Sequence, residues 1–262
     1  MASKAWAFFK RDLLIDLSYK LSFAFGAVHI LITVAAFFFL ASVLDAPTMQ
    51  GYDSFAFILT GLAVNAYMTT CLVCFTYVVR ESQVSGTLKA VLVTPTSPGQ
   101  FLAFSSLYPL ARATLDAAIY GAVGLTLGVS LAGVNPLPAL LVFAASVLAF
   151  SSIGMISATF ILIFKRGDPL LWLFGSGSWL LGGVMYPTDV LPRGLQQLAE
   201  VLPITHALRG LRAALLADAS VTAVVPELTV LATFVVVGLP ASIGIFEFGL
   251  WQAKATGTLG HQ

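Results

Sequence analysis

The sequence predicts an all-α, polytopic membrane protein with six transmembrane helices. Of its 262 residues, 58% are hydrophobic and only 10% are charged, and the mean hydropathy is +0.94, whereas soluble domains carry about 25% charged residues. Its 13 basic and 12 acidic side chains cannot cover a water-facing surface of this size. The composition excludes a cytosolic enzyme, a secreted disulfide scaffold and a disordered chain. The net charge of +1, without basic clusters, argues against nucleic acid as a partner.

Residues 1–20 predict a helix that lies along the cytoplasmic membrane interface. The segment mixes acidic and basic residues with four apolar side chains on one helical stripe, Trp6, Phe9, Leu13 and Leu17. A helix with one apolar and one charged face lies in the plane of the interface instead of crossing the membrane.

Long uncharged stretches predict the six spans, because about 20 apolar residues cross the hydrocarbon of a bilayer. The stretches lie between Lys20 and Asp45, Asp53 and Arg80, Asp116 and Lys165 (two spans), Asp168 and Asp189, and Glu227 and Glu247. The double-length stretch divides at residues 133–138, where two prolines predict a turn. Residues 90–111 are also uncharged, but their three prolines argue against a continuous helix. The third span is therefore expected to begin near Leu110.

The positive charges predict that both termini face the cytoplasm. With six spans, all but three of the 13 Lys and Arg residues fall on the side of the termini. The exceptions share the connection between spans five and six: Arg193, Arg209 and Arg212. The positive-inside rule then gives a multi-pass protein of the cytoplasmic (plasma) membrane with cytoplasmic termini.

The cytoplasmic connection, residues 80–109, contains a short segment with one apolar face. Gly86 predicts a break after the second span, and Thr87 can cap a short helix that ends before Pro95. The apolar face consists of three residues spaced i, i+3 and i+4, Leu88, Val91 and Leu92. Such a helix either docks into a groove of a soluble partner or rests on the lipid headgroups.

This connection resembles the coupling segment of the permeases of type 2 ATP-binding-cassette (ABC) exporters. The resemblance is carried by Glu81, Gly86-Thr87-Leu88 and Leu92-Val93-Thr94-Pro95, with Lys89 where the pattern usually has a carboxylate. It implies that a separate ATPase subunit contacts Glu81, Gly86, Thr87, Leu88, Thr94 and Pro95.

The external connection, residues 187–226, together with the end of the fifth span before it, resembles a second signature of the same family. The resemblance is carried by four features that precede an arginine-bearing helix. They are the glycine pair Gly182 and Gly183, the Tyr-Pro of Tyr186 and Pro187, the Leu-Pro of Leu191 and Pro192, and a further proline, Pro203. The resemblance implies external re-entrant helices between spans five and six, which dip into the outer leaflet and form a gate from these residues. Both connections and the order of spans match, so the resemblance covers essentially the whole chain.

Two groups of polar residues at membrane depth are candidates for contact with substrate or lipid. Arg112 and Asp116 are spaced i, i+4 and are expected to form an ion pair within one helix, or else a contact at the substrate entrance. Asn65 lies in the middle of the second span, where it either bonds a neighbouring helix or lines the pathway.

Arg209 and Arg212 are the candidates on the external side. They either meet lipid phosphates or an anionic substrate, or they extend to the headgroups and pair with Asp218 or Glu200.

The chain contains no P-loop sequence and no His-Glu-x-x-His zinc motif, so no catalytic residue, metal or cofactor is expected on it. The whole chain, 1–262, is expected to form a single transmembrane permease domain. The resemblance implies the permease subunit of an ATP-driven exporter of an amphipathic, lipid-like, drug-like or glycan substrate. It also implies a second permease copy (a homodimer) in membrane lipid and two ABC ATPase subunits that bind ATP and Mg²⁺. An ion-coupled secondary transporter and a non-transporting membrane scaffold subunit stay open as alternatives.

Overall fold

Long apolar helices build the protein, as a computed structural model describes it for residues 2–43, 48–87, 97–130, 133–164 and 168–255. Within these residues the only strands form a short hairpin, β1 (Thr48–Met49) with β2 (Tyr52–Asp53). The α-helices are α1 (Ala2–Ser18), α2 (Lys20–Val43), α3 (Ser54–Val84), α5 (Pro98–Thr126), α6 (Pro136–Phe164), α7 (Pro169–Leu181), α8 (Arg193–Glu200), α9 (Pro203–Leu216), α10 (Val221–Thr233) and α11 (Leu239–Ala255). The 3₁₀ turn η1 (Thr188–Val190) precedes α8, and the π-helical turn η2 (Phe234–Gly238) joins α10 to α11. The described chain is therefore all-α in class.

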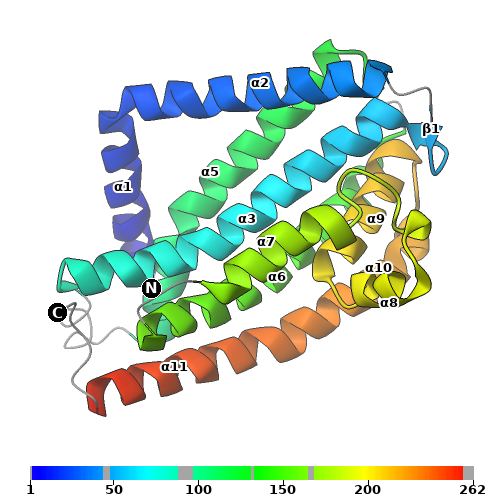
Figure 1. Cartoon of the computed structure of the whole chain (residues 1–262). Helices are drawn as coiled ribbons and strands as arrows, with labels where there is room; N and C mark the ends of the chain where they lie inside the picture. The colour runs from blue at the N-terminus through cyan, green and yellow to red at the C-terminus, as the bar shows by residue number, and fades with distance from the viewer. Residues whose placement is uncertain (1, 44–47, 88–96, 131–132, 165–167, 256–262) are drawn as a thin grey trace.

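Successive long helices run in alternating directions through the molecule (Figure 1). Helices α2, α5 and α7 run toward the right-hand end of the view, and α3, α6 and α10–α11 run back toward the left. The hairpin and the short helices α8 and α9 lie at the right-hand end, and the last turns of α11 lie at the left. The two long connections of the sequence therefore lie at opposite ends of the bundle.

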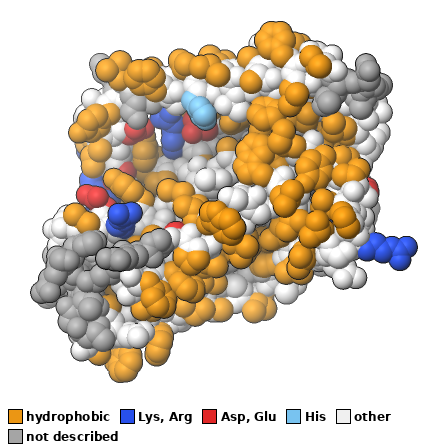
Figure 2. All heavy atoms as spheres, in the orientation of Figure 1, with side chains coloured by type: hydrophobic (Ala, Val, Ile, Leu, Met, Phe, Trp, Pro, Cys, Tyr) orange, Lys and Arg blue, Asp and Glu red, His pale blue; other side chains and the backbone are white. Residues whose placement is uncertain are grey.

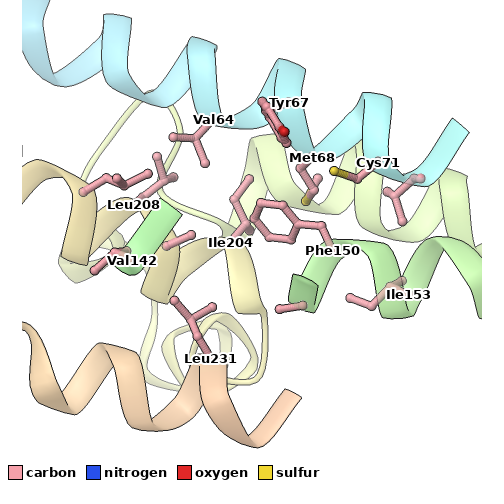
Figure 3. Close-up of a cluster of buried hydrophobic side chains, with 14 of the residues drawn as sticks. Val64, Tyr67, Met68, Cys71, Val142, Phe150, Ile153, Ile204, Leu208 and Leu231 are labelled. Carbon is pink, nitrogen blue, oxygen red and sulfur yellow. The ribbon is translucent and has the colours of Figure 1, made fainter. Parts of the chain in front are cut away.

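Helix α3 lies at the centre, packed against α5, α6, α7 and α9. Figure 3 shows side chains of α3, α6 and α9 that meet in the core, among them Val64, Tyr67, Met68, Phe150, Ile204 and Leu208. Close approach of α3 and α6 depends on Gly154, where an added Cβ would lie 2.4 Å from the carbonyl oxygen of Cys71.

Among the described residues, four helical segments are long and apolar enough to cross a membrane: Phe23–Val43, Ser54–Val84, Pro136–Phe164 and Val221–Ala255. They correspond to the expected spans one, two, four and six. At the position of the expected fifth span, α7 has only 13 residues, which is about 20 Å at 1.5 Å per residue. This helix is shorter than the sequence predicts because Gly182 and Gly183 end it.

The expectation that the prolines of residues 90–111 prevent a continuous helix is wrong for the described part of this segment, because α5 begins at Pro98 and continues through Pro109. Helix α5 is not among the four candidate spans, so a third span that begins near Leu110 stays a prediction. Ser97 caps the helix, and its side chain and that of Gln100 bond each other's backbone N–H groups. Pro98 occupies the first position, where the helix needs no backbone donor. Pro109 lies inside the helix and removes one hydrogen bond, a loss that the packing of α5 against α1, α2 and α3 offsets.

The N-terminal segment forms the expected helix, α1, and joins α2 at a sharp corner (Figure 1). Aromatic side chains attach α1 to α5: the ring centroids of Phe8 and Phe101 lie 6.2 Å apart, and those of Phe9 and Tyr108 lie 5.7 Å apart. The position of α1 at a membrane interface stays a prediction.

Candidate functional site

The end of α3 at the left of Figure 1 carries the described part of the predicted coupling segment. The 31 residues of α3 extend about 46 Å at 1.5 Å per residue, well beyond the roughly 30 Å of a hydrocarbon core. Arg80 and Glu81 are exposed near this end. The predicted break at Gly86 is confirmed: Gly86 has a φ of +71° and donates its N–H to the carbonyl of Gln83 at 3.3 Å.

Two contacts fix this end of α3. The buried Gln83 side chain donates to the carbonyl oxygen of Leu162 on α6 at 3.4 Å, and the hydroxyls of Ser85 and Thr87 bond each other at 2.9 Å. Leu88, Thr94 and Pro95, and with them the predicted short helix, lie outside the described residues. The structure therefore groups Glu81, Gly86 and Thr87 at one exposed helix end.

Arg212 of α9 is buried at the opposite end of the molecule, with 4% of its surface exposed. Its guanidinium donates to the carbonyl oxygens of Gly183 at 2.9 Å, Phe57 at 3.0 Å and Val184 at 3.1 Å. The guanidinium carbon also lies 3.3 Å from the centroid of the Phe57 ring. These bonds join α9 to the first turn of α3 and to the chain that follows α7. The buried Arg212 therefore shows neither the predicted contact with lipid or substrate nor the alternative pairing with Asp218 or Glu200.

The glycines around Arg212 make this junction possible. Gly183 has a φ of +74°, a conformation that glycine adopts without strain. A Cβ on Gly61 of α3 would lie 1.9 Å from the Val184 carbonyl oxygen, so no other residue fits there without displacing the chain. The sequence identified the glycine pair after α7 as a gate element, but nothing in the sequence pairs Gly61 with residue 184.

The other predicted gate residues start or fix the short elements that follow α7. Three prolines precede or open these elements: Pro187 caps η1, Pro192 caps α8, and Pro203 is the first residue of α9. The Tyr186 hydroxyl donates to the carbonyl of Leu180. The carbonyl of Leu191 accepts from the side chain of Gln196 at 2.8 Å.

An outer cluster of Glu200, His206, Arg209 and Glu227 joins α8, α9 and α10. Arg209 donates to Glu200 at 2.9 Å and to the Thr188 hydroxyl at 3.1 Å, so of the predicted alternatives the pairing with Glu200 is the observed one. Nδ1 of His206 bonds the Glu227 carboxylate, and its Nε2 lies 2.9 Å from the Glu200 carbonyl oxygen.

Hydrogen bonds set the protonation of this outer cluster. The bond to Glu227 raises the pKa of His206, and the bond from Arg209 lowers the pKa of Glu200. The sequence did not suggest the pairing of His206 with Glu227, because the two residues lie 21 positions apart on different helices.

An inner cluster of Asp16, Tyr108, Arg112 and Asp116 joins α1 to α5. The predicted pair within one helix is confirmed, with Nε of Arg112 3.2 Å from Asp116, and a second branch of the guanidinium lies 3.1 Å from Asp16. The Tyr108 hydroxyl donates to the same Asp16 oxygen. Figure 2 shows charged side chains gathered in a hollow bordered by α1 and α2. The sequence missed Asp16, which looked like an ordinary charge of an interfacial helix.

Asn65 is buried in α3, and its Oδ1 has no hydrogen-bond partner among the described residues. It therefore does not show the expected bond to a neighbouring helix through this atom, and the packing and pathway interpretations both stay open. A cavity of about 170 Å³ lies between α3, α5, α6 and α9 beside Tyr67, whose hydroxyl bonds Thr114 at 3.2 Å. The described residues contain no group of three or more His, Cys, Asp or Glu side chains arranged to hold a metal ion.

The long apolar helices and the polar connections at their two ends define a multi-pass helical membrane protein. A family model described as "ABC-2 type transporter" matches residues 4–216. The chain belongs to this family and is an ABC transporter permease. The matched region contains the cytoplasmic connection and the external connection as far as residue 216, the last residue of α9. A comparison with curated proteins finds no match.

Proposed function

We propose that this permease is the membrane subunit of an ATP-driven exporter, which moves an amphipathic, lipid-like, drug-like or glycan substrate outward across the cytoplasmic membrane. The observation that carries the proposal is the family match over residues 4–216, because it includes the coupling connection and the connection after α7 through the end of α9. The exposed end of α3 at Glu81, Gly86 and Thr87 supports docking of a soluble partner there.

In this proposal the chain is one permease domain with six spans and both termini in the cytoplasm. The alternating directions of α2, α3, α5, α6, α7 and α10–α11 support it (Figure 1). The short helices α8 and α9 are the external re-entrant elements, at the end of the bundle opposite the coupling segment. The distribution of Lys and Arg along the sequence supports this orientation.

Two copies of the permease work with two ABC ATPase subunits, which bind ATP and Mg²⁺. The broad apolar surfaces of α2 and α7 favour a second copy, together with lipid, as their covering. Phe37 of α2 and Trp179 of α7 stack with ring centroids 6.4 Å apart, so apolar side chains of the two helices meet at this point. Trp172 and Leu180 of α7 are also exposed on this helix.

ATP binding closes the ATPase dimer and pushes on the coupling segment that contains Glu81, Gly86, Thr87, Leu88, Thr94 and Pro95. Helix α3 transmits this motion because it is continuous from the coupling end to the outer end. At the coupling end Gln83 attaches it to α6. At the outer end Phe57 attaches it through Arg212 to Gly183 and Val184. A tilt of α3 therefore acts directly on the gate formed by Gly182, Gly183, Tyr186, Pro187, Leu191, Pro192 and Pro203.

Substitutions at the coupling end test this function. In proteoliposomes with the ATPase that co-purifies with the chain, Glu81→Ala and Gly86→Ala should lower permease-stimulated ATP hydrolysis severalfold while the helical circular dichroism stays unchanged. Gly194→Ala, in the open surroundings of α8, is the matched control and should behave like the wild type. Full stimulation in both coupling variants would contradict the proposal.

A further inference from the structure

A groove of about 600 Å³ lies between α1, α2 and α5, apart from the gate and the coupling end. Its walls are mostly apolar, from Phe9, Leu13, Leu17, Phe23, Ala111 and Leu115. A second hollow of about 320 Å³ shares Asp16, Tyr108 and Arg112 with the groove and reaches Thr70 of α3. Both volumes lie in the range that is typical of sites for small organic molecules. The groove therefore has an apolar wall and a polar floor formed by Asp16, Tyr108 and Arg112, and Asp116, the fourth member of the inner cluster, lines the adjoining second hollow.

The floor carries more negative than positive charge. Two carboxylates, Asp16 and Asp116, face one guanidinium, and two of the nitrogens of Arg112 already donate to them. The face of that guanidinium lies against the Phe23 ring, 3.9 Å from its centroid. The nearby Arg11 and Asp12 of α1 pair with each other at 2.7 Å and do not change the balance.

The carboxylates of the floor also have unused acceptor atoms. Among the described residues, nothing donates a hydrogen bond to Oδ1 of Asp16 or to Oδ2 of Asp116, whereas the other oxygen of each group is bonded. Asp16 and Asp116 are 28% and 33% exposed, and both line the second hollow, so a molecule that extends from the groove into this hollow can reach them. Charge and hydrogen-bond capacity therefore both favour a cation that carries N–H groups.

The rim of the groove suits an apolar group. Leu17, Phe23 and Leu115 line the groove and are 57%, 41% and 46% exposed. Phe23 begins the apolar stretch of α2 that is long enough to cross a membrane. The mouth of the groove is therefore apolar and lies next to a helix segment that is long enough to cross a membrane. An amphipathic molecule can place its apolar part at this mouth and its charge on the floor.

We propose that the groove binds an amphipathic amine, with the protonated nitrogen between Asp16 and Asp116 and the apolar part against Phe9, Leu13 and Phe23. Such amines are then the substrate class of the exporter. This assignment of the bound molecule as cargo rests on the proposed function, whereas binding itself requires only this chain.

Equilibrium binding to the full chain in phosphatidylcholine nanodiscs tests the proposal. The probe is the cationic dye rhodamine 6G, followed by fluorescence polarisation against empty nanodiscs. We expect saturable binding that dodecylamine displaces and dodecanoate does not. Asp16→Asn and Asp116→Asn should each weaken binding about tenfold, the scale of a partly buried charge contact. Asp218→Asn makes the same charge change at an exposed position and should leave binding unchanged.

A second pair of variants leaves the inner cluster intact. Ala111→Trp fills the groove from an exposed position of α5 and should abolish saturable binding, whereas Ala118→Trp, on the same helix outside the groove, should not. Wild-type binding by Ala111→Trp, displacement by dodecanoate, or no saturable binding by the wild type would each overturn the inference.

Transport separates this inference from the proposed function. With the ATPase present, wild-type proteoliposomes should export rhodamine 6G on addition of ATP, and Ala111→Trp should not. Binding that depends on Asp116 without any ATP-driven export of the dye would overturn the cargo assignment, whereas the exporter function itself is tested by the stimulation of ATP hydrolysis in the Glu81→Ala and Gly86→Ala variants. ATP-driven export of the dye by Ala111→Trp at the wild-type rate would overturn only the inference.

Discussion

At the scale of single residues, Arg212 is the clearest case of a buried charge with a structural task. Its guanidinium satisfies three main-chain carbonyls from two segments and stacks on Phe57. A planar guanidinium with several fixed donors can bond the three carbonyls and stack on the ring at the same time, whereas an ammonium group offers three donors but no planar face to stack. Charge alone does not predict this task, because an arginine in an external connection ordinarily extends toward water.

Replacing Arg212 tests this task. Arg212→Met should lower the melting temperature strongly, because each buried carbonyl left without a donor costs about 1–3 kcal/mol. Arg212→Lys should recover part of the loss. Thermal melting in nanodiscs measures the effect, and Arg193→Met, at an exposed position of α8, is the control. Equal melting temperatures for Arg212→Met and Arg193→Met would show that the buried contacts contribute nothing.

The glycine opposite this junction allows an equally sharp comparison. Gly61→Ala places a Cβ 1.9 Å from the Val184 carbonyl oxygen and should destabilise the protein by several kcal/mol, whereas Gly121→Ala on α5 meets nothing within 4 Å. The second change should be neutral or slightly stabilising, because alanine favours a helix. The melting temperature of Gly61→Ala should therefore lie well below the wild-type value, and that of Gly121→Ala should lie at or slightly above it. A stable Gly61→Ala protein would contradict the described approach of α3 to residue 184.

At the scale of elements, the outer cluster joins the helices α8, α9 and α10 through titratable side chains. Both ring nitrogens of His206 on α9 lie next to hydrogen-bond acceptors: Nδ1 lies next to the Glu227 carboxylate of α10, and Nε2 lies next to the Glu200 carbonyl of α8. Arg209 holds Glu200 from the same helix as His206. A doubly protonated ring satisfies both acceptors, so the attachment of α8 and α9 to α10 depends on this proton.

The pH dependence of stability follows from the pKa of His206, which the bond to Glu227 raises in the folded state. A raised folded pKa contributes stability that is fully present below the unfolded pKa of about 6.5. That contribution is lost as the pH rises through the folded pKa, and a tenfold gain in proton affinity on folding corresponds to about 1.4 kcal/mol. Glu200, whose pKa is lowered, stays ionised over this range.

The wild-type melting temperature should therefore fall between about pH 6 and about pH 9 by more than that of His206→Gln. Thermal melting of both proteins across this range is the measurement, and parallel curves would contradict the account. Glu227→Gln should flatten the curve in the same way, since it removes the bond that raises the pKa.

Local sequence signals predicted some elements well and others poorly. Gly86, the turn at 133–138 and the glycine pair after α7 each mark a break that the structure contains, because such residues act on the backbone next to them. The start of α5 was predicted wrongly because three prolines outweighed the cap at Ser97, and the packing that tolerates Pro109 is not local. The length of α7 was overestimated because an uncharged stretch does not specify where a helix ends.

The candidate site residues show the same difference between local signals, which the sequence carries, and helix packing, which it does not. Arg112 and Asp116 were found because they are one turn apart on one helix. Asp16, and the pair of His206 with Glu227, depend on how α1, α9 and α10 pack, and no spacing in the sequence carries that information. Arg212 was recognised as notable for its charge, but its burial follows only from the fold.

At the scale of the whole molecule, one long helix connects the proposed coupling end to the proposed gate. Helix α3 runs through the centre from the exposed coupling residues to the junction at Arg212 (Figure 1). The membership of the ABC-2 type transporter family and this continuous connection support an exporter whose outer gate responds to an ATPase at the inner face. The groove at the inner cluster lies beside this helix, because its second hollow reaches Thr70.

Transport by the reconstituted permease with its ATPase tests this central claim most directly. Outward movement of rhodamine 6G, measured in proteoliposomes, should require the permease, the ATPase and hydrolysable ATP together, and it should not respond to an imposed ion gradient. Movement that follows an ion gradient without nucleotide would contradict the exporter function, and no movement under either condition would contradict the dye as its cargo.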